Sequence, residues 1–430
     1  MHDFNFILFV FLVFLFSSCE NRESYVSAEE YKALVEFYKA TDGNNWKNNK
    51  GWDITQDPEK NTVNVEWEGI VLHNHHVVLL HLSENNLKGK IPVAIEKFTF
   101  LEGISLNSNE ITEIPKEIGN LKNLKKIYIS SNKIKEIPKE ISNSTSLEAI
   151  YINQNLIEKL PNEIGKLENL VRLECYENQL TEIPNSIGNL KRLKTLNLSK
   201  NKIESLPNEI GGCESLENLD LYKNKLIALP KSISKLGQLK QLNIAINQLT
   251  DLSSEFAQLK SLETLNIGSN NFVGKIPQVV FELKNLNILQ LYENNLDSLP
   301  KQIGNLKHLV RLSLSENNLK ILPNEITNLT KLEELELRAN SFEVFPQNIL
   351  QLSTLKTLNV EKNKLESIPS EISRLNQLET LYMSQNEITT LPPSLAELTK
   401  LEYVSFDRDK IENLEELKEF MKLKAGILGR

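Results

Sequence analysis

Apolar residues recur along most of the chain at fixed distances from a repeating asparagine. They stand eight, five and three places before it and usually two after it, as around Asn201 with Leu193, Leu196, Leu198 and Ile203. The period is 23 residues, and 24 in two copies. The repeating position is occupied by Asn85, Asn109, Asn132, Asn155, Asn178, Asn201, Asn224, Asn247, Asn270, Asn294, Asn317, Asn340, Asn363, Asn386 and, in a fifteenth copy, Asp409. This period indicates units that bury a core only by stacking on one another.

Two leucines spaced two apart in each copy predict a short strand that alternates between core and open face. The asparagine follows the strand, where its amide is expected to satisfy backbone groups of the turn and of the neighbouring coil. We expect Asp409 to take this place in the last coil, which has no further neighbour to serve. A proline column then predicts the start of a short helical turn, because proline fixes φ and needs no amide there. Ser253 replaces proline in one copy, which predicts a looser coil.

The consensus LxxLxLxxNxLxxLPxxIGxLxx resembles the leucine-rich repeat, over roughly residues 77–409. The resemblance implies an α/β fold, a right-handed leucine-rich repeat solenoid with a curved parallel sheet on the concave face and short helical turns on the convex face. The two 24-residue copies contain GKIP at 89–92 and 274–277 and resemble the plant-type repeat.

The first residues have the features of an export signal. Phe6 to Phe16 is an apolar run too short to span a bilayer, followed by Ser17, Ser18 and Cys19. The ending FSSC resembles a bacterial lipobox, although MHDFN lacks Lys and Arg and Phe16 stands where Leu is usual. We expect a signal peptide at 1–18, then a lipidated Cys19 and tether at 19–27, and an exported outer-membrane or cell-surface lipoprotein whose only link to the membrane is this lipid. The alternative is simple secretion.

Residues 28–76 predict an N-terminal cap. Ser27 and Glu30 form a capping-box pattern before a helix to about Ala40. The following segment, with tryptophans at 46, 52 and 67, resembles the cap of bacterial and plant extracellular leucine-rich repeat proteins. Val65 and Leu72 replace the two cysteines of the plant form. The indoles are therefore expected to close that end of the core without a disulfide.

The far end of the chain and the remaining cysteines predict structural roles. Residues 410–430 place apolar side chains on one helical face, which predicts a C-terminal cap helix. Cys175 and Cys213 fill leucine positions in different coils, so we expect both to be free and buried.

Composition excludes several functions. Net charge is −8, and the basic residues form no block, which argues against a nucleic-acid partner. His73, His75, His76 and His81 lie close in sequence, but no cysteine or nearby carboxylate completes a metal-ligand set, and the stretch is expected to be an exposed turn. No catalytic triad, phosphate loop or metalloprotease motif is present, so we predict neither enzymatic activity, nor a cofactor, nor a metal.

The open strand face is the candidate binding surface. We call the positions six, four and two places before each repeat asparagine the inner columns. They hold Tyr128, Tyr151, Arg172, Glu174, Tyr176, Asp220, Tyr222, Tyr292, Arg311, Glu334, Glu336, Arg338, Tyr382 and Tyr403. Tyrosine and arginine are enriched at binding hot spots, although tyrosine also suits strand surfaces for its own packing. We predict that Tyr128 and Tyr151 lie one strand apart and that Arg172, Glu174 and Tyr176 complete a patch with them.

The resemblance implies a non-enzymatic recognition protein that binds a protein ligand on the concave face. Two alternatives stay open. The tyrosines would also suit a glycan ligand as stacking platforms, and LPxxIGxL repeats also resemble those of intracellular Ras-pathway scaffold proteins. A glycan array would test the first alternative, and the mature N-terminus would test the second.

Overall fold

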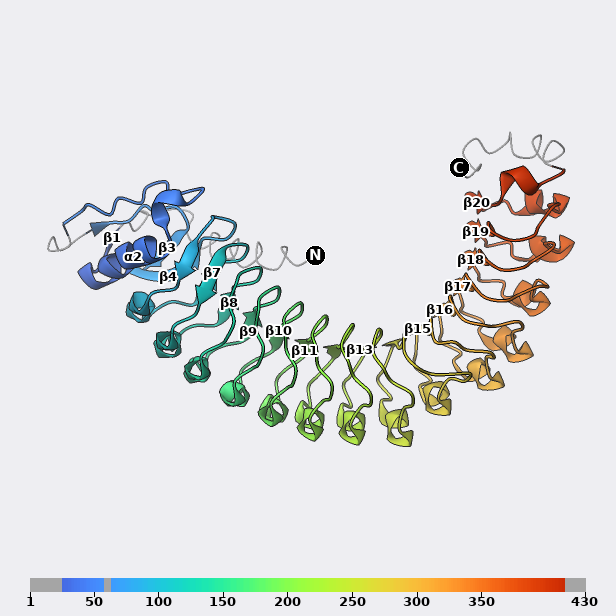
Figure 1. The fold of residues 1–430 in the computed structure, drawn as a ribbon, viewed down its shortest axis with the longest axis horizontal. Helices are drawn as coiled ribbons and strands as arrows, with labels where there is room; N and C mark the ends of the chain where they lie inside the picture. The colour runs from blue at the N-terminus through green and yellow to red at the C-terminus, as the bar shows by residue number, and fades with distance from the viewer. Residues whose placement is uncertain (1–24, 58–62, 414–430) are drawn as a thin grey trace. The chain divides into compact units, whose positions relative to one another are not determined.

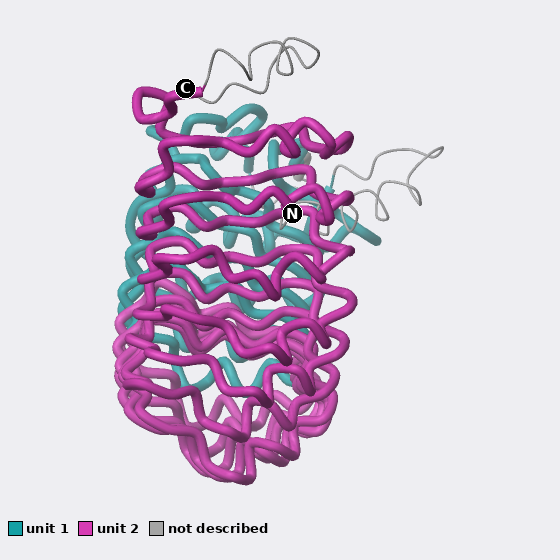
Figure 2. The backbone as a smooth tube through the Cα atoms, turned by 90° about the vertical axis from the view of Figure 1, so that its right-hand side faces the viewer, with its two compact units in different colours: residues 1–157 teal, residues 158–430 magenta. Residues whose placement is uncertain are grey.

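The computed structural model describes residues 25–57 and 63–413. The chain divides into two compact units, residues 1–157 and residues 158–430, which Figure 2 distinguishes by colour. The predicted signal peptide, Cys19 and nearly all of the predicted C-terminal cap helix lie outside the described residues. Among the described residues, no helix has both the length and the apolar character needed to cross a membrane.

Unit 1 begins with a cap built on helix α2 (Ala28–Ala40), which starts where the capping pattern predicted. Ser27 Oγ accepts a hydrogen bond from Glu30 N at 3.2 Å. The Glu30 carboxylate departs from the capping box, because it turns to strand β4 (His76–His81) and its Oε1 accepts a bond from Val77 N at 3.2 Å. His76 Nδ1 lies 3.5 Å from its other oxygen. Burial raises the pKa of Glu30, and the bond from Val77 opposes that rise. Glu30 thus connects the helix to the sheet.

The three tryptophans fill the space between α2 and the first coils, as predicted. The rings of Trp46 and Trp52 have centroids 4.8 Å apart, and those of Trp52 and Trp67 are 4.5 Å apart. Trp46 also donates a hydrogen bond from Nε1 to Thr41 O at 2.8 Å. The remaining cap elements are β1 (Tyr25–Val26), its antiparallel partner β2 (Val63–Asn64), and the 3-10 helix η1 (Gly43–Asn45).

The histidine-rich stretch forms the turn of a β-hairpin. Strand β3 (Ile70–His73) pairs antiparallel with β4, and Asn74 and His75 between them have φ of 50° and 63°. The sequence analysis correctly placed an exposed turn here but did not predict β3. The ring of His76 stacks on Phe100 with centroids 4.0 Å apart.

The repeats of unit 1 continue from β4 in parallel register. Their elements are β5 (Lys88–Lys90), η2 (Val93–Lys97), β6 (Gly103–Ser105), β7 (Glu110–Glu113), η3 (Lys116–Asn120), β8 (Lys126–Tyr128), η4 (Lys139–Asn143) and β9 (Ala149–Tyr151). The first 24-residue copy adds the small parallel pair β5–β7. Gly89 in this pair has φ of 104°, and a Cβ there would lie 2.5 Å from Ala40 O, so the close approach to α2 requires glycine.

Unit 2 is a curved stack of coils with strands on the concave side and 3-10 helices on the convex side (Figure 1). Its strands are β10 (Arg172–Glu174), β11 (Thr195–Asn197), β12 (Asn218–Asp220), β13 (Gln241–Asn243), β14 (Thr264–Asn266), β15 (Ile288–Gln290), β16 (Arg311–Ser313), β17 (Glu334–Glu336), β18 (Thr357–Asn359), β19 (Thr380–Tyr382) and β20 (Tyr403–Ser405). Its 3-10 helices are η5 (Asn162–Lys166), η6 (Asn185–Asn189), η7 (Asn208–Gly212), η8 (Lys231–Lys235), η9 (Ser254–Gln258), η10 (Gln278–Glu282), η11 (Lys301–Asn305), η12 (Asn324–Asn328), η13 (Gln347–Gln351), η14 (Ser370–Arg374), η15 (Pro393–Glu397) and η16 (Arg408–Lys410). All neighbouring strands within the unit pair in parallel.

The repeat asparagines hold each turn and the neighbouring coil together, as predicted. Asn201 donates from Nδ2 to Leu198 O at 2.9 Å in its own coil and to Cys175 O at 3.1 Å in the preceding coil. Its Oδ1 accepts from Leu180 N at 3.0 Å. The turn also requires a left-handed residue immediately before the asparagine, such as Lys200 with φ of 53°. The sequence analysis did not predict this left-handed position.

The proline column begins the outer turns, and Ser253 does not disturb it. Pro230 precedes η8 with φ of −67° and ψ of 145°, and Ser253 precedes η9 with φ of −64° and ψ of 154°. Both helices contain five residues. The expected looser coil is therefore not visible in the backbone, which takes the proline conformation without a proline.

The last coil departs from the repeat, and the expectation for Asp409 was wrong. Asp409 is exposed within η16. The preceding turn is instead served by Asp407, whose Oδ2 accepts from Gln385 N at 2.8 Å and from Asn386 N at 3.3 Å. Because Asp409 lies in η16, the carboxylate that accepts these bonds belongs to Asp407, two residues before the position that the repeat period indicates.

Candidate recognition surface

The repeat forces the inner columns to the open face of the strands. Leu196 and Leu198 are fully buried, while Asn197 between them points the other way and is half-buried. Because the strands pair without a shift in register, Asn197 lies beside Asp220 and Asp220 lies beside Asn243. Side chains in one inner column therefore form a row with the spacing of neighbouring strands.

In unit 1 the surface centres on Tyr128 and Tyr151, which pair in register on β8 and β9. Their rings are stacked with centroids 4.6 Å apart and an interplanar angle of 12°. This confirms that the two rings lie about one strand spacing apart. One face of each ring is therefore covered by the other ring.

In unit 2 the first predicted residues are Arg172, Glu174 and Tyr176. Arg172 Nη1 lies 2.9 Å from Glu174 Oε1, and the Glu174 side chain is only 4% exposed. The sequence analysis placed Glu174 on the open strand face, but its side chain is buried and orients Arg172. Tyr176 is half-buried. That these three residues form one patch with Tyr128 and Tyr151 stays a prediction.

The centre of unit 2 holds Tyr222 and Tyr292, with Ala245 and Gly268 between them in the same inner column. A Cβ on Gly268 would lie 2.4 Å from the Tyr292 ring, so the ring rests directly on the glycine. The Tyr292 hydroxyl group also has a hydrogen bond with the Asn266 side chain. Burial raises the pKa of Tyr292 and outweighs the opposite effect of this bond. Ala245 and Gly268 are buried, whereas both tyrosines are partly exposed. The tyrosines thus stand on a floor of small residues.

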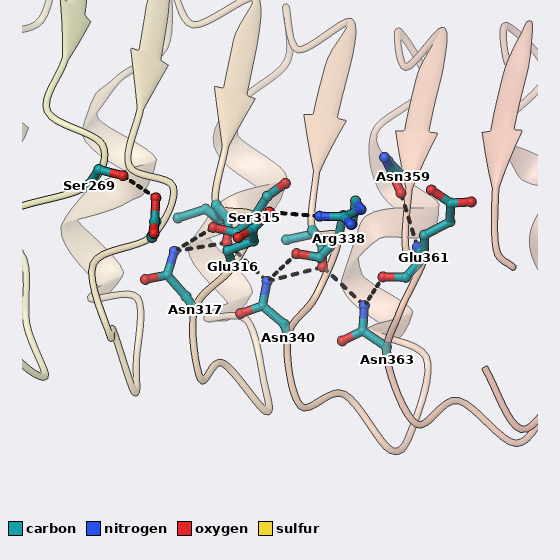
Figure 3. A network of polar contacts seen from close by, with 12 residues as sticks. Ser269, Ser315, Glu316, Asn317, Arg338, Asn340, Asn359, Glu361 and Asn363 are labelled. Carbon is teal, nitrogen blue, oxygen red and sulfur yellow. Dashed lines mark hydrogen bonds and ion pairs between the residues drawn. The ribbon is translucent and has the colours of Figure 1, made fainter. Parts of the chain in front are cut away.

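The C-terminal part of unit 2 carries charged pairs and a second tyrosine pair. Arg311 Nε lies 3.0 Å from Glu334 Oε1. Arg338 reaches Glu316 of the preceding coil, at 2.7 Å between Nη1 and Oε1 (Figure 3). The rings of Tyr382 and Tyr403 have centroids 5.3 Å apart at 49°. The expected binding residues Arg311 and Tyr382 therefore lie on the inner face, and the arginines are already oriented by carboxylates.

Two inner-column carboxylates are shifted by their surroundings. Burial raises the pKa of Asp220, and the nearby Glu174 adds to the shift. Burial likewise raises the pKa of Glu336, with contributions from Glu334 and Glu361 in the same direction. The surroundings of Asp220 and Glu336 on the inner face of unit 2 therefore disfavour their ionised forms.

The side chains of the inner columns differ from those of the rest of the repeats. Every tyrosine between residues 77 and 409 stands in an inner column. In the described coils of unit 2 the cations of these columns are Arg172, Arg311 and Arg338, and none is lysine, although lysine is much the commoner cation in the chain. Interfaces enrich tyrosine and arginine and deplete lysine. Strand propensity would explain the tyrosines but not the arginines.

Three residues of this surface escaped the sequence analysis: Ala245, Ile246 and Gly268. Ala245 and Gly268 matter because they leave room for the two tyrosines, and a search for the smallest residues in each column would have found them. Ile246 occupies the left-handed position before Asn247, with φ of 52°. Finding Ile246 requires knowledge of the backbone, which the apolar pattern does not contain.

No other site chemistry emerges from the described residues. Within them, no group of three or more His, Cys, Asp or Glu side chains is arranged to hold a metal ion. Cys175 and Cys213 are free and buried, as predicted, and burial raises the pKa of Cys213 to about 12. Such thiols are poor nucleophiles at neutral pH.

Comparison with known families identifies the class of protein. A family model described as a leucine-rich repeat region matches residues 185–273 and 267–360, and a leucine rich repeat model matches residues 99–157 and 344–411. The chain belongs to the leucine-rich repeat family, and its fold is the expected solenoid of parallel strands and short outer turns. No curated protein matches the chain in sequence.

Solved structures of the same fold come from bacteria and plants. A leucine-rich repeat protein of Leptospira interrogans is 36% identical, with a TM-score of 0.73, and the match covers 82% of this chain and 95% of that one. A plant peptide hormone receptor, RGFR1, solved in complex with RGF2, is 28% identical, with a TM-score of 0.60 and coverage of 77% and 63%. An internalin of Listeria monocytogenes is 24% identical, with a TM-score of 0.62 and coverage of 89% and 98%, and this match concerns the fold alone. One of these proteins, RGFR1, is a peptide hormone receptor, so this fold can serve as a binding module.

Proposed function

We propose that this protein is a non-enzymatic recognition protein whose inner strand face binds a protein partner. The observation that carries the proposal is the distribution of side chains: every tyrosine of the repeats stands in an inner column, and in the described coils of unit 2 the cations of these columns are arginine and never lysine. A fold that only needed a soluble surface would have no reason to separate the two cations, whereas a flat, hydrogen-bonding guanidinium group suits an interface.

The arrangement of the inner face favours a protein over a glycan. Tyr128 and Tyr151 cover each other's ring faces, and the Tyr292 ring lies on Gly268. Stacking on a sugar requires an open ring face, and each of these three rings already has one face covered. The related plant receptor, solved in complex with a peptide hormone, is consistent with a polypeptide ligand.

Export and lipidation belong to the same proposal and rest on the sequence. The apolar run ending in Ser17, Ser18 and Cys19 is the supporting observation. Cys19→Ser is expected to shift the protein from membrane to soluble fractions, and mass spectrometry should find Cys19 as the mature, lipid-modified N-terminus. An intact Met1–Ser18 segment in cytosolic protein would instead support the intracellular scaffold.

Site-specific photo-crosslinking tests the binding face. A photoreactive phenylalanine replaces Tyr292 on the inner face or, as the matched control, Lys301 on the outer turn, in cells that express the full chain. We expect a crosslinked partner from position 292 and none from position 301, and Tyr292→Ala should weaken binding of that partner. Crosslinking from position 301 alone would place the partner on the convex side and overturn the proposal.

A further inference from the structure

Ile246 occupies a backbone position that suits it poorly. The residue before each repeat asparagine is left-handed, and Ile246 has φ of 52°. Other copies place Ser, Gln, Glu, Lys or Ala there, as at Ser131, Lys200 and Ala339. A β-branched side chain is disfavoured in this region because Cβ crowds the following carbonyl group. The strain has no structural purpose, since the turn forms equally well with the other residues, and such strain is a pointer to function.

The surroundings of Ile246 follow from the neighbouring coils. A side chain at this left-handed position reaches the inner column of the adjacent coil, as Glu316 does with Arg338 at 2.7 Å. Lys200, in the same position, forms an ion pair with Glu177 at the left-handed position of the preceding coil. The pKa of Lys200 is raised mainly by Glu177 and, to a smaller extent, by Tyr222 and Tyr176 of the two neighbouring coils. The repeat therefore places Ile246 between Tyr222 of one neighbouring coil and Gly268 of the other.

These residues form a small aromatic and aliphatic surface at the centre of unit 2. Tyr292 lies on Gly268 and so borders Ile246 from the far side. Tyr222, Ile246 and Tyr292 are all partly exposed, while Ala245 beneath them is buried. We call Tyr222, Ala245, Ile246, Gly268 and Tyr292 the apolar window.

Charge on the inner columns separates this window from its surroundings. From Thr195 to Tyr292 the inner columns contain a single charged residue among those described, Asp220, which is largely buried. On either side stand the pairs Arg172–Glu174 and Arg311–Glu334. An uncharged aromatic centre with a charged rim is the arrangement of a protein interface around its hot spot.

We propose that the apolar window is the anchor subsite for one uncharged apolar side chain of a polypeptide ligand. This inference rests on the proposed function and specifies where the inner face takes its main contact. The charge pattern indicates which ligand fits. The ligand has an apolar residue opposite Ile246, and its charged residues, of both signs, lie opposite the pairs Arg172–Glu174 and Arg311–Glu334. A charged side chain at the centre would lose its hydration against Ile246 and the two rings. The charged residues at the left-handed positions next to Tyr222 and Tyr292, Lys223 and Glu293, are exposed to solvent, so they would offset little of this loss.

The test uses a phage-displayed library of random linear peptides selected on the full chain. We expect the enriched peptides to share one Leu, Ile, Phe, Tyr or Trp, and replacement of that residue by Asp to abolish binding. Ile246→Asn should weaken the peptides by about tenfold or more and also raise the melting temperature, because asparagine tolerates the left-handed backbone. A purely structural role for Ile246 would change the melting temperature without changing affinity.

Lys362→Asn is the matched control. Lys362 has φ of 53° at the same position of a distant coil, so the substitution relieves the backbone equally. It should raise the melting temperature and leave peptide affinity unchanged. Tyr292→Ala separates the two proposals: loss of binding in Tyr292→Ala with full binding in Ile246→Asn overturns the anchor subsite alone. Three other results would also overturn the anchor subsite: full binding in both variants, a charged residue as the shared residue of the selected peptides, or a library that yields no binder. Full binding in both variants and a library without a binder would count against inner-face binding as well.

Discussion

The inner columns and the outer turns are exposed surfaces of the same coils, yet the chain uses them differently. The outer turns begin at proline and carry lysines such as Lys139, Lys231 and Lys301. The inner columns carry every tyrosine of the repeats and, in unit 2, only arginine as cation. Both surfaces satisfy the fold equally, so the difference between them supports the proposal that the inner columns serve recognition.

Electrostatics distinguishes the two surfaces in the same way. On the outer side, a hydrogen bond from Lys231 is the largest cause lowering the pKa of Glu255 to about 2. On the inner side, burial raises the pKa of Asp220 and of Glu336. Glu255 is thus placed where the ionised form is favoured. Asp220 and Glu336 are placed where it is disfavoured, a pattern more typical of functional surfaces than of solvated ones.

The largest expected effect comes from the core that both surfaces share. Leu198 is fully buried beside the asparagine turn. Leu198→Ala should lower the free energy of unfolding by roughly 2–5 kcal/mol, because it removes buried methyl groups and leaves a cavity. Chemical denaturation measures the change. Lys225→Ala, at an exposed position of the next coil, should cost under about 0.5 kcal/mol, and equal losses for the two variants would contradict the assignment of strand faces.

The next effect should appear in binding and not in stability. Tyr151→Ala is expected to weaken a captured partner by about 2 kcal/mol, as removal of a tyrosine hot spot does. Lys139→Ala, on the outer turn η4 of unit 1, should change affinity little. Calorimetric titration of both variants decides between the surfaces. A silent Tyr151→Ala beside a damaging Lys139→Ala would reverse the comparison.

Sequence periodicity predicted the coils because one constraint repeats in every copy. The apolar positions, the asparagine bonds and the proline turns were all visible in this way, as Asn201 and Pro230 illustrate. Strand β3 and the role of Asp407 were missed because each occurs once, at an end of the stack. Where no neighbouring copy imposes the geometry, local hydrogen bonding decides it.

The sequence predicted which residues face inward on the candidate surface, but not their burial, their contacts or their backbone angles. Column counting put Glu174 on the inner face, yet Glu174 is buried against Arg172, because long side chains of neighbouring columns fold onto one another. Ile246 was overlooked because its importance depends on a backbone angle. Period and side-chain type define which residues face inward, while burial and backbone strain require the three-dimensional structure.

A smaller effect, on stability and its dependence on pH, should distinguish the inner carboxylate Asp220 from an outer one. Asp220 stands in a column where Asn197, Asn243 and Asn266 hold the same place. Asp220→Asn should stabilise the protein at neutral pH by about 1 kcal/mol, because it fits the column and removes a charge disfavoured by burial. The pKa of Asp220 is raised in the folded state, so the folded protein binds the proton more tightly and wild-type stability falls as pH rises through that pKa.

The advantage of Asp220→Asn should therefore disappear in acid, below the ordinary pKa of aspartate, where wild-type Asp220 is neutral in both states. Thermal unfolding of both proteins across this pH range measures it. Glu217, whose pKa is lowered by Lys240 and Lys194, supplies the opposite case. Glu217→Gln should show no gain at neutral pH. An advantage of Asp220→Asn that grew as the pH fell would contradict the assignment.

The smallest expected effect concerns the outer turn alone. Ser253 already has the φ of −64° that proline imposes, at the place where Pro230 and Pro277 begin neighbouring turns. Ser253→Pro should therefore raise the free energy of unfolding by about 0.4–1 kcal/mol, because it restricts the unfolded chain without straining the folded one. The loss of the Ser253 hydroxyl bond to Glu255, which also contributes to that carboxyl's low pKa, sets the lower end of this gain. Binding should be unaffected, since the change lies on the convex side. A destabilised Ser253→Pro would mean that the serine hydroxyl, and not the backbone angle, maintains this turn.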